Sequence, residues 1–367
     1  MITMVENVHR MMHQAIKDNI FPGAVLLAAK ADSIYLHEAY GHANLFTESE
    51  MTKDTLFDLA SLTKPLATAL AVMELIKRDQ MRLEQQLGSL LQPFKSTPKA
   101  PITIKQLLCH NSGLPDYVPY YKGISQYPIS QRTDALRKCL VREALVYPTG
   151  SQVLYSDLGF MILRWVIETI AKQRLNRLVE EAIYKPLGIN DLFFIETDKK
   201  RPTNNCLKRL FAATEQCPWR NTVLEGVVHD ENAYIVGGVE GHAGLFGTAR
   251  ALYALLIELL NAFHGNSKTT FFSSELVRLF WEPCGNGMRT PGFDLPSAKG
   301  SSSGRYFSHH SVGHLGFTGT SFWMEPASGI IIILLTNRVH PLRTNNKIRK
   351  FRPQLHDMIM KLIKDSA

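Results

Sequence analysis

The chain has 367 residues, 45% of them hydrophobic, and can bury a large core in one to three structural units. No apolar run is long enough to span a bilayer, which excludes a transmembrane segment, and the first ten residues contain no apolar signal core. We therefore expect a soluble protein located in the cytoplasm.

The formal net charge is +8, and much of it lies near the C-terminus, at Arg343, Lys347, Arg349, Lys350 and Arg352. Such a cluster is most often a solvated basic face, and weak contact with a membrane surface or an acidic partner is the alternative. No motif or interleaved aromatic residues favour nucleic-acid binding. The five cysteines are odd in number and follow no spacing pattern, so we expect reduced thiols.

The predicted elements begin with a helix over 5–19 and two strands over 23–29 and 34–40. Helices then dominate from 61 to about 187, interrupted by Pro-rich loops at 93–101 and 115–128. The rest is expected to comprise, in order, a mostly loop segment over 188–235, a helix from about 249, a Gly/Ser-rich loop over 284–305, strands over 320–325 and 330–337, and a helix over about 353–364.

This order predicts an α+β fold in a single domain over 1–367. The sheet subdomain, about 1–60 and 236–367, is expected to form one antiparallel sheet flanked by helices. The helical subdomain, about 61–235, is inserted between its two pieces. Because ligand sites often form between such units, we expect the active site in the cleft between them.

The most informative motif is Ser61-Leu62-Thr63-Lys64, at the head of an apolar helix that is predicted to run to about Arg78. Pro65 is tolerated only in a first helical turn, so this helix must begin near Ser61. Residues three apart share a face, so the Lys64 amine can reach the serine hydroxyl. The helix N-terminus also favours negative charge at that oxygen. Taken alone, an ordinary N-cap serine is the commoner case for Ser61.

A second segment with the same Ser-x-x-Lys spacing is Ser96-Thr97-Pro98-Lys99. It lies in a Pro-rich loop with no apolar helix behind it, so we reject it as a catalytic motif.

Tyr155-Ser156-Asp157 is the second candidate motif, where a loop marked by Pro and Gly leads into an apolar helix over 158–170. A tyrosine here can carry a proton, but its reference pKa of about 10 requires a nearby cation such as Lys64. Taken alone, a half-buried structural tyrosine is the commoner case.

The third motif, Gly313-His314-Leu315-Gly316-Phe317, precedes the last predicted hairpin. Glycines that flank a polar residue on a strand indicate close approach of a ligand to the backbone. For His314 alone, a structural histidine is again the commoner case.

In this order the three motifs resemble the serine β-lactamase and penicillin-binding-protein family, in its class C-like branch, with the pattern Ser-x-x-Lys, Tyr-x-Asn and Lys/His-Thr-Gly. The resemblance covers roughly residues 5–362 and implies a β-lactamase-like fold that needs no cofactor and no metal. It implies that Ser61 is the acylated nucleophile and that Lys64 and Tyr155 share its proton as general base and acid.

The same resemblance implies a set of substrate-binding residues, namely Asp157, His314, Leu315, Gly316 and Phe317. The backbone N–H groups of Ser61 and Phe317 are expected to form an oxyanion hole. His314 is expected to stand in for the cation on the leaving-group side.

Two departures from the family pattern concern the substrate. Asp157 replaces an asparagine, and an ionised carboxylate cannot donate a hydrogen bond to a substrate carbonyl, although it can pair with Lys64 and keep it protonated. Leu315 replaces a threonine whose hydroxyl helps to hold a substrate carboxylate in the family. This weakens the case for β-lactams and for peptides that end in D-Ala, unless Thr318 supplies the missing donor.

The segment 228–244 resembles cytosolic members of the family that cut the bond between N-acetylmuramic acid and L-alanine during cell-wall recycling. The predicted function is therefore a serine hydrolase that acts on such a muropeptide amide as a small-molecule substrate. The alternatives are a small-ester carboxylesterase, a β-lactamase or D-Ala peptidase, and a non-catalytic binding protein on this fold. His229, Asp230 and Glu231 have the composition of a metal cluster, but a solvated loop is the favoured interpretation.

Overall fold

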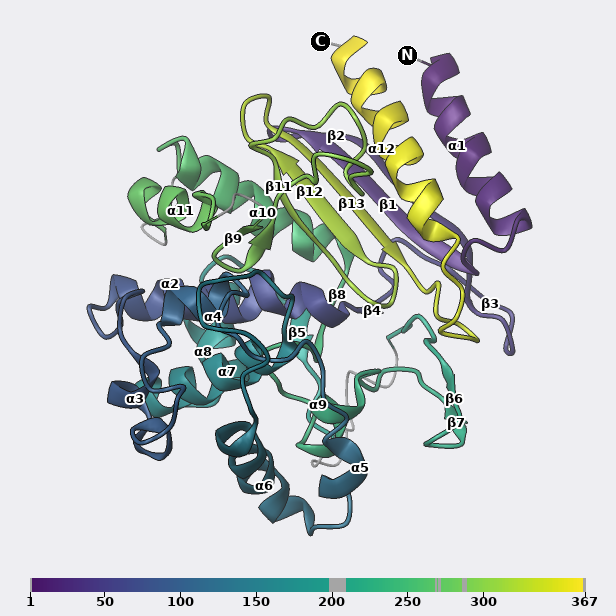
Figure 1. The fold of residues 1–367 in the computed structure, drawn as a ribbon. Helices are drawn as coiled ribbons and strands as arrows, with labels where there is room; N and C mark the ends of the chain where they lie inside the picture. The colour runs from purple at the N-terminus through teal and green to yellow at the C-terminus, as the bar shows by residue number, and fades with distance from the viewer. Residues whose placement is uncertain (1, 198–208, 268, 270–271, 286–288, 366–367) are drawn as a thin grey trace.

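A computed structural model describes residues 2–197, 209–267, 269, 272–285 and 289–365 (Figure 1). Its centre is an eight-stranded antiparallel sheet in the order β3-β2-β1-β13-β12-β11-β10-β9. The strands are β1 (Gly23–Lys30), β2 (Ser33–Asn44), β3 (Ser49–Glu50), β9 (Arg289–Thr290), β10 (Phe293–Asp294), β11 (Val312–Leu315), β12 (Ser321–Glu325) and β13 (Ile330–Thr336). Because β1 pairs with β13, the two ends of the chain share one sheet.

The central strands are apolar on both faces because both faces are covered. Along β1, Val25 and Leu27 belong to one core cluster, whereas Leu26 and Ala28 belong to another. This alternation follows the two-residue period of a strand. The unbroken apolar run of β13 divides between the two clusters in the same way.

Helices cover the two faces of the sheet. α1 (Ile2–Lys17) and α12 (Ile348–Asp365) contact each other and pack on one face (Figure 1). On the opposite face, α10 (Ala249–Phe263) contacts β1 and β13, and α11 (Ser274–Trp281) packs against α10. The α+β class that the sequence predicts is therefore confirmed.

The mostly helical region also lies on the α10 side of the sheet and shares its core. It contains η1 (Ala60–Leu62), η2 (Lys64–Ala69), α2 (Leu70–Lys77), α3 (Leu87–Leu90), η3 (Gln92–Phe94), α4 (Ile104–Leu108), α5 (Tyr121–Ile124), α6 (Ile129–Arg142), α7 (Asp157–Ala171), α8 (Leu175–Val179) and η4 (Glu180–Tyr184). α7 has a defined start, because the Ser156 hydroxyl accepts a hydrogen bond from the Gly159 N–H at 3.3 Å. Tyr155 and Asp157 therefore flank a fixed helix terminus.

Short elements occur within the segment 188–235, which the sequence predicts as mostly loop, and in stretches for which the sequence predicts no element. They are β4 (Phe57–Asp58), β5 (Leu192–Phe194) and β8 (Leu245–Gly247), which form a small sheet, the hairpin of β6 (Gln216–Cys217) and β7 (Thr222–Val223), and the helix α9 (Glu231–Ile235). Strands of two or three residues are too short to show alternation, which explains why the sequence does not reveal them. The division of the chain into subdomains near residues 60 and 235 stays a prediction.

The prediction of reduced thiols is wrong for two cysteines. Cys109, at the end of α4, and Cys284, after α11, form a disulfide with their Cα atoms 6.0 Å apart. Cys139 and Cys217 are free thiols, whereas Cys206 lies outside the described residues. The paired residues are 175 positions apart, and only the fold brings them together.

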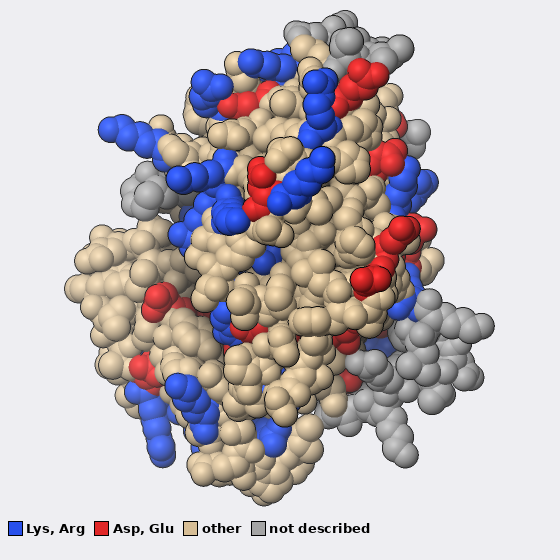
Figure 2. Space-filling view, turned by 90° about the vertical axis from the view of Figure 1, so that its right-hand side faces the viewer, with Lys and Arg blue, Asp and Glu red and all other residues tan. Residues whose placement is uncertain are grey.

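The basic residues near the C-terminus do not form one solvated face. Arg343 pairs with Glu215 and Glu231, and buried Arg352 donates a hydrogen bond to the Gly319 carbonyl. Lys347, Arg349 and Lys350 are exposed, but Figure 2 shows acidic side chains interspersed among the basic ones on the side of the molecule that carries α1. Among the described residues, no helix has the length and apolar character needed to cross a membrane.

Candidate active site

The turn that presents Ser61 has a constrained backbone. Ala60, immediately before it, has a φ of 47°, in the left-handed region that residues with a Cβ rarely adopt. The buried Asp58 carboxylate accepts hydrogen bonds from the Ala60 N–H at 2.9 Å and the His229 N–H at 2.6 Å. These contacts hold a conformation that costs on the order of 1–3 kcal/mol, as is typical of functional sites. Ser61 itself is half-buried.

The helix after Ser61 does not run as one α-helix to Arg78. A 3₁₀ turn, η1, passes into a π-helical turn, η2, before α2 begins at Leu70. Pro65 lies at the start of η2, where its missing N–H costs no hydrogen bond. Single π-helical turns are frequent at functional sites.

Lys64 is fully buried, and its ammonium contacts the Ser61 hydroxyl directly. Nζ donates to Ser61 Oγ at 3.1 Å, to Asp157 Oδ1 at 2.7 Å and to the His242 carbonyl at 3.3 Å. Burial acts to lower the pKa of Lys64, but the Asp157 carboxylate and Tyr155 raise it above its ordinary value. The resting site therefore holds an ammonium beside the serine.

Tyr155 lies on the other side of that ammonium, with Lys64 Nζ 4.7 Å from its ring centroid. Its hydroxyl is close enough to Ser61 and Lys64 for both side chains to influence the pKa of Tyr155. Burial raises the pKa of Tyr155, and the nearby ammonium only partly offsets this rise. The phenol is therefore neutral at rest, as a proton donor must be.

Two side chains that the sequence does not reveal hold the tyrosine ring. The His110 ring stacks on Tyr155 at 4.5 Å, and the Arg289 guanidinium lies 4.9 Å from its centroid. Burial lowers the pKa of His110 well below its ordinary value, so it is neutral. Arg289 pairs with Asp294. Each residue is tied to one cysteine of the disulfide. His110 directly follows Cys109, and the Arg289 carbonyl accepts a hydrogen bond from the Cys284 N–H at 2.7 Å.

The third predicted motif lies on β11 and the turn that follows it. His314 is buried, and burial lowers the pKa of His314 to about 4, so the expected cation is a neutral imidazole near pH 7. Leu315 is half-buried, and Gly316 N–H donates to the Thr320 carbonyl at 2.7 Å. The Phe317 ring is 47% exposed and stacks on His229. The structure thus brings His314 within 6.0 Å of Tyr155, measured between ring centroids.

Two threonines tie this turn to the residues that precede Ser61. The Thr318 hydroxyl donates to the Asp58 carbonyl at 2.8 Å, and the Thr320 hydroxyl donates to the Leu59 carbonyl at 3.1 Å. These bonds place the turn that contains Phe317 against the residues that precede Ser61. Because the buried Thr318 hydroxyl is already engaged, it does not replace the donor that Leu315 lacks.

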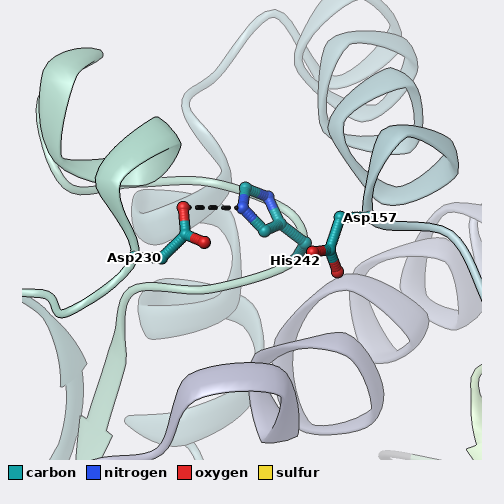
Figure 3. A group of neighbouring side chains, drawn as sticks. All are labelled: Asp157, Asp230 and His242. Atoms are coloured by element: carbon teal, nitrogen blue, oxygen red, sulfur yellow. Dashed lines mark hydrogen bonds and ion pairs between the residues drawn. The ribbon is translucent and has the colours of Figure 1, made fainter. Parts of the chain in front are cut away.

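Figure 3 shows Asp157 beside a second charged pair, Asp230 and His242. His242 Nε2 lies 3.0 Å from Asp230 Oδ1. Burial acts to lower the pKa of His242, but Asp230 raises it, and His242 in turn keeps the pKa of Asp230 below its usual range. The three side chains offer ligand atoms within 4.8 Å of one another. Asp157 is already paired with the Lys64 ammonium, and Asp230 with His242, so any metal would compete with both pairs.

The interpretation of residues 229–231 as a solvated loop is wrong. His229 and Glu231 are buried, and each has a charged partner. His229 Nε2 lies 3.2 Å from Glu215 Oε2, and Glu231 pairs with Arg343. The segment lines the active site, and only the fold reveals this, because its partners lie 12 to 171 residues away.

A serine, a buried lysine one turn later and a tyrosine beside that lysine are the residue types that a serine hydrolase site requires. A sequence model described as beta-lactamase matches residues 8–355. An N-acetylmuramyl-L-alanine amidase of Bacillus subtilis (strain 168) is 33% identical over 90% of this chain and 81% of its own. A putative D-alanyl-D-alanine carboxypeptidase of Escherichia coli (strain K12) is 30% identical over 87% of this chain and 79% of its own. The chain therefore belongs to the beta-lactamase family, and it is a serine hydrolase.

Solved structures show the same fold. EstCE1, a hydrolase with promiscuous acyltransferase activity, has a TM-score of 0.71 at 22% identity, covering 95% of this chain and 98% of its own. The octameric penicillin-binding protein homologue from Pyrococcus abyssi has a TM-score of 0.72 at 18% identity, covering 99% of this chain and 76% of its own. The β-lactamase-like fold that the sequence predicts is confirmed.

Proposed function

We propose that this serine hydrolase is an amidase that cleaves the bond between N-acetylmuramic acid and L-alanine. The observation that carries the proposal is the 33% identity to the Bacillus subtilis amidase over 90% of the chain.

In the acylation step, Ser61 Oγ attacks the lactyl carbonyl carbon of the muramic acid. Lys64, in its neutral form, takes the serine proton, since Nζ lies 3.1 Å from Oγ. The C–N bond then breaks, and the proton passes through Lys64 or the neutral Tyr155 to the departing L-alanine amine. The acyl group stays on Ser61 as an ester.

The tetrahedral oxyanion is held in this scheme by the N–H groups of Ser61 and Phe317. The threonine bonds from the β11–β12 turn to the nucleophile segment support this assignment, because they fix the two segments together. Water then attacks the ester, and Tyr155 and Lys64 move its protons in the reverse direction. Gly316 provides the room at the turn, since a Cβ there would lie 2.0 Å from Thr320 Oγ1.

Hydrolysis of a small ester by the same site is the second candidate function. It is favoured by Leu315, which suits a neutral or apolar group on the side where relatives use threonine. Cleavage of β-lactams or of D-Ala peptides is the third candidate, and the same residue disfavours it.

The cytoplasmic location is a separate proposal. The Cys109–Cys284 disulfide argues against it, because disulfides rarely persist in a reducing cytoplasm. The test is the redox state of Cys109 and Cys284 in cells of the protein's source, measured by rapid thiol trapping. Free thiols support a cytoplasmic location, and an intact disulfide overturns it.

The test of the proposed function is hydrolysis of N-acetylmuramoyl-L-alanine by the purified protein, with p-nitrophenyl butyrate and nitrocefin in parallel. We expect release of L-alanine, and none from Ser61→Ala. Ser96→Ala is the matched control, because Ser96 starts the other Ser-x-x-Lys sequence, is exposed and should not affect activity. Hydrolysis of the ester alone would replace the amidase assignment with the esterase one.

A further inference from the structure

A group of aromatic side chains lies on the surface beside the catalytic residues. We call Tyr117, Tyr121, Trp219 and Tyr234 the aromatic platform. Trp219, in the tip of the β6–β7 hairpin, makes edge contacts with Tyr121 at 5.0 Å and with Tyr234 at 6.0 Å between ring centroids. Trp219 is 42% exposed and Tyr117 is 40% exposed.

The platform is continuous with the active site. The Asp157 N–H donates to the Asp116 carbonyl at 2.9 Å, so Tyr117 follows a residue that is bonded to the catalytic segment. Burial raises the pKa of Tyr117, and the charges of Asp230 and Glu231 add to this rise.

Tyr121, the second residue of the aromatic platform, is also bonded to a segment that lines the site. Tyr121 N–H donates to Asn232 Oδ1 at 2.9 Å, and Asn232 lies on α9, directly after Asp230 and Glu231. The aromatic platform therefore reaches from Tyr117, next to the residue bonded to Asp157, to Trp219 at the hairpin tip.

An arginine holds the far end of the platform. The Arg220 guanidinium lies 4.1 Å from the Tyr234 ring centroid and 5.3 Å from that of Trp219. It also donates to the carbonyls of Val228 at 2.7 Å and His229 at 2.8 Å. The hairpin tip is thus pre-ordered against the site, which reduces the entropy that binding would cost.

We propose that the aromatic platform is a subsite for the pyranose ring of the substrate, and so places the sugar on the side of the site formed by Tyr117 and Trp219. A pyranose presents C–H bonds on its faces and hydroxyls around its edge. Its face matches the electron-rich face of an aromatic ring, and its edge matches nearby polar groups such as Asp116 and Arg220. An apolar acyl chain would offer no hydroxyl to either of these groups. This inference rests on the proposed amidase function.

The experiment compares two substrates with the same scissile bond: N-acetylmuramoyl-L-alanine and D-lactoyl-L-alanine, which lacks the sugar. We expect Trp219→Ala and Tyr117→Ala each to lower kcat/KM for the first by about 3- to 10-fold, mainly through KM, as loss of one stacking contact does. Neither variant should change kcat/KM for the second. Tyr306→Ala is the matched control, because Tyr306 is also exposed beside cations but lies against α12, on the other face of the sheet.

Binding gives a second readout that does not need turnover. Titration of Ser61→Ala with N-acetylmuramic acid should change the tryptophan fluorescence, and this change should disappear in the Ser61→Ala, Trp219→Phe double variant. Far-UV spectra and thermal melting of each variant check that the hairpin still folds.

The outcomes separate the subsite from the proposed function. Equal losses on both amides, or an equal loss on p-nitrophenyl hexanoate, would overturn the sugar subsite and leave the amidase standing. If neither amide is hydrolysed, the proposed function fails, and the titration decides the subsite: a Trp219-dependent signal supports it, and no signal rejects it.

Discussion

Lys64 Nζ lies closer to Asp157 Oδ1, at 2.7 Å, than to the Ser61 oxygen, at 3.1 Å. The amine that accepts the serine proton in the proposed mechanism is therefore held as an ammonium by a carboxylate. An asparagine at position 157, as in relatives with the Tyr-x-Asn pattern, would carry no charge and would not raise the pKa of Lys64 in this way.

The first prediction is that Asp157→Asn shifts the pH dependence of catalysis. Removing the carboxylate lowers the pKa of Lys64, so a larger fraction of the amine is neutral at a given pH. kcat should rise with increasing pH as Lys64 loses its proton, and the midpoint of this rise should move to lower pH by about one unit or more. The measurement is kcat for p-nitrophenyl butyrate over a pH series. Asp116→Asn, which removes an exposed carboxylate nearby, is the control.

An unmoved limb would show that Asp157 does not set the charge of Lys64. Loss of activity at every pH would instead show that Asp157 is itself an obligatory proton acceptor.

The second prediction concerns the two proton carriers. Lys64→Arg keeps a cation that stays protonated, and Tyr155→Phe removes only the hydroxyl. Each should lower kcat by about 100-fold or more, as loss of general acid–base catalysis does. Lys99→Arg is the control, since Lys99 donates to the Glu143 carbonyl and does not touch the site. Near-normal turnover of both variants would place the base elsewhere.

The contact between Ser61 and Lys64 was predictable because the two residues are close in sequence. Ser61 and Lys64 lie one turn apart, and Pro65 fixes where that turn begins. The central strands were predictable because their apolar runs are long. The charged partners Asp230 and His242, and the side chains of His110 and Arg289 that hold Tyr155, were not predictable, because each reaches the site from a distant segment through the fold. The sequence predicts a cation at His314. Its neutral state could not be predicted, because the burial that lowers the pKa of His314 arises only from the fold.

The third prediction concerns the substrate preference set by Leu315. Leu315→Thr introduces a hydroxyl beside the site, and Leu315→Val is the matched control without it. One charge-assisted hydrogen bond contributes about 1.5–3 kcal/mol, so nitrocefin acylation should rise by roughly 10-fold or more in the threonine variant. Hydrolysis of p-nitrophenyl butyrate, which has no carboxylate, should change much less. Equal changes for both substrates, or rapid nitrocefin turnover by the unmodified enzyme, would contradict the role of Leu315.

The fourth prediction is an acid-sensitive stability that depends on His314. Its pKa is about 4 in the folded protein and about 6.5 in the unfolded chain, so the unfolded state binds more protons between these values. Stability is therefore lost as the pH falls from 6.5 towards 4, by up to about 3 kcal/mol. His314→Gln should reduce this loss between pH 7.5 and 5 in urea unfolding. His310→Gln, at an exposed position, should not, and an unchanged acid loss in His314→Gln would assign it to other groups.

The last prediction concerns the disulfide between Cys109 and Cys284, which joins α4 of the helical region to the segment after α11. Closing a loop of 175 residues restricts the unfolded chain, so Cys109→Ser should lower the free energy of unfolding by about 2–4 kcal/mol. The neighbours of these cysteines, His110 and Arg289, hold the Tyr155 ring, so kcat should fall as well. Cys139→Ser, which removes a free thiol, is the control. Urea unfolding with and without dithiothreitol provides the measurement. Identical midpoints in the oxidised and reduced protein would show that the two thiols are not bonded in solution.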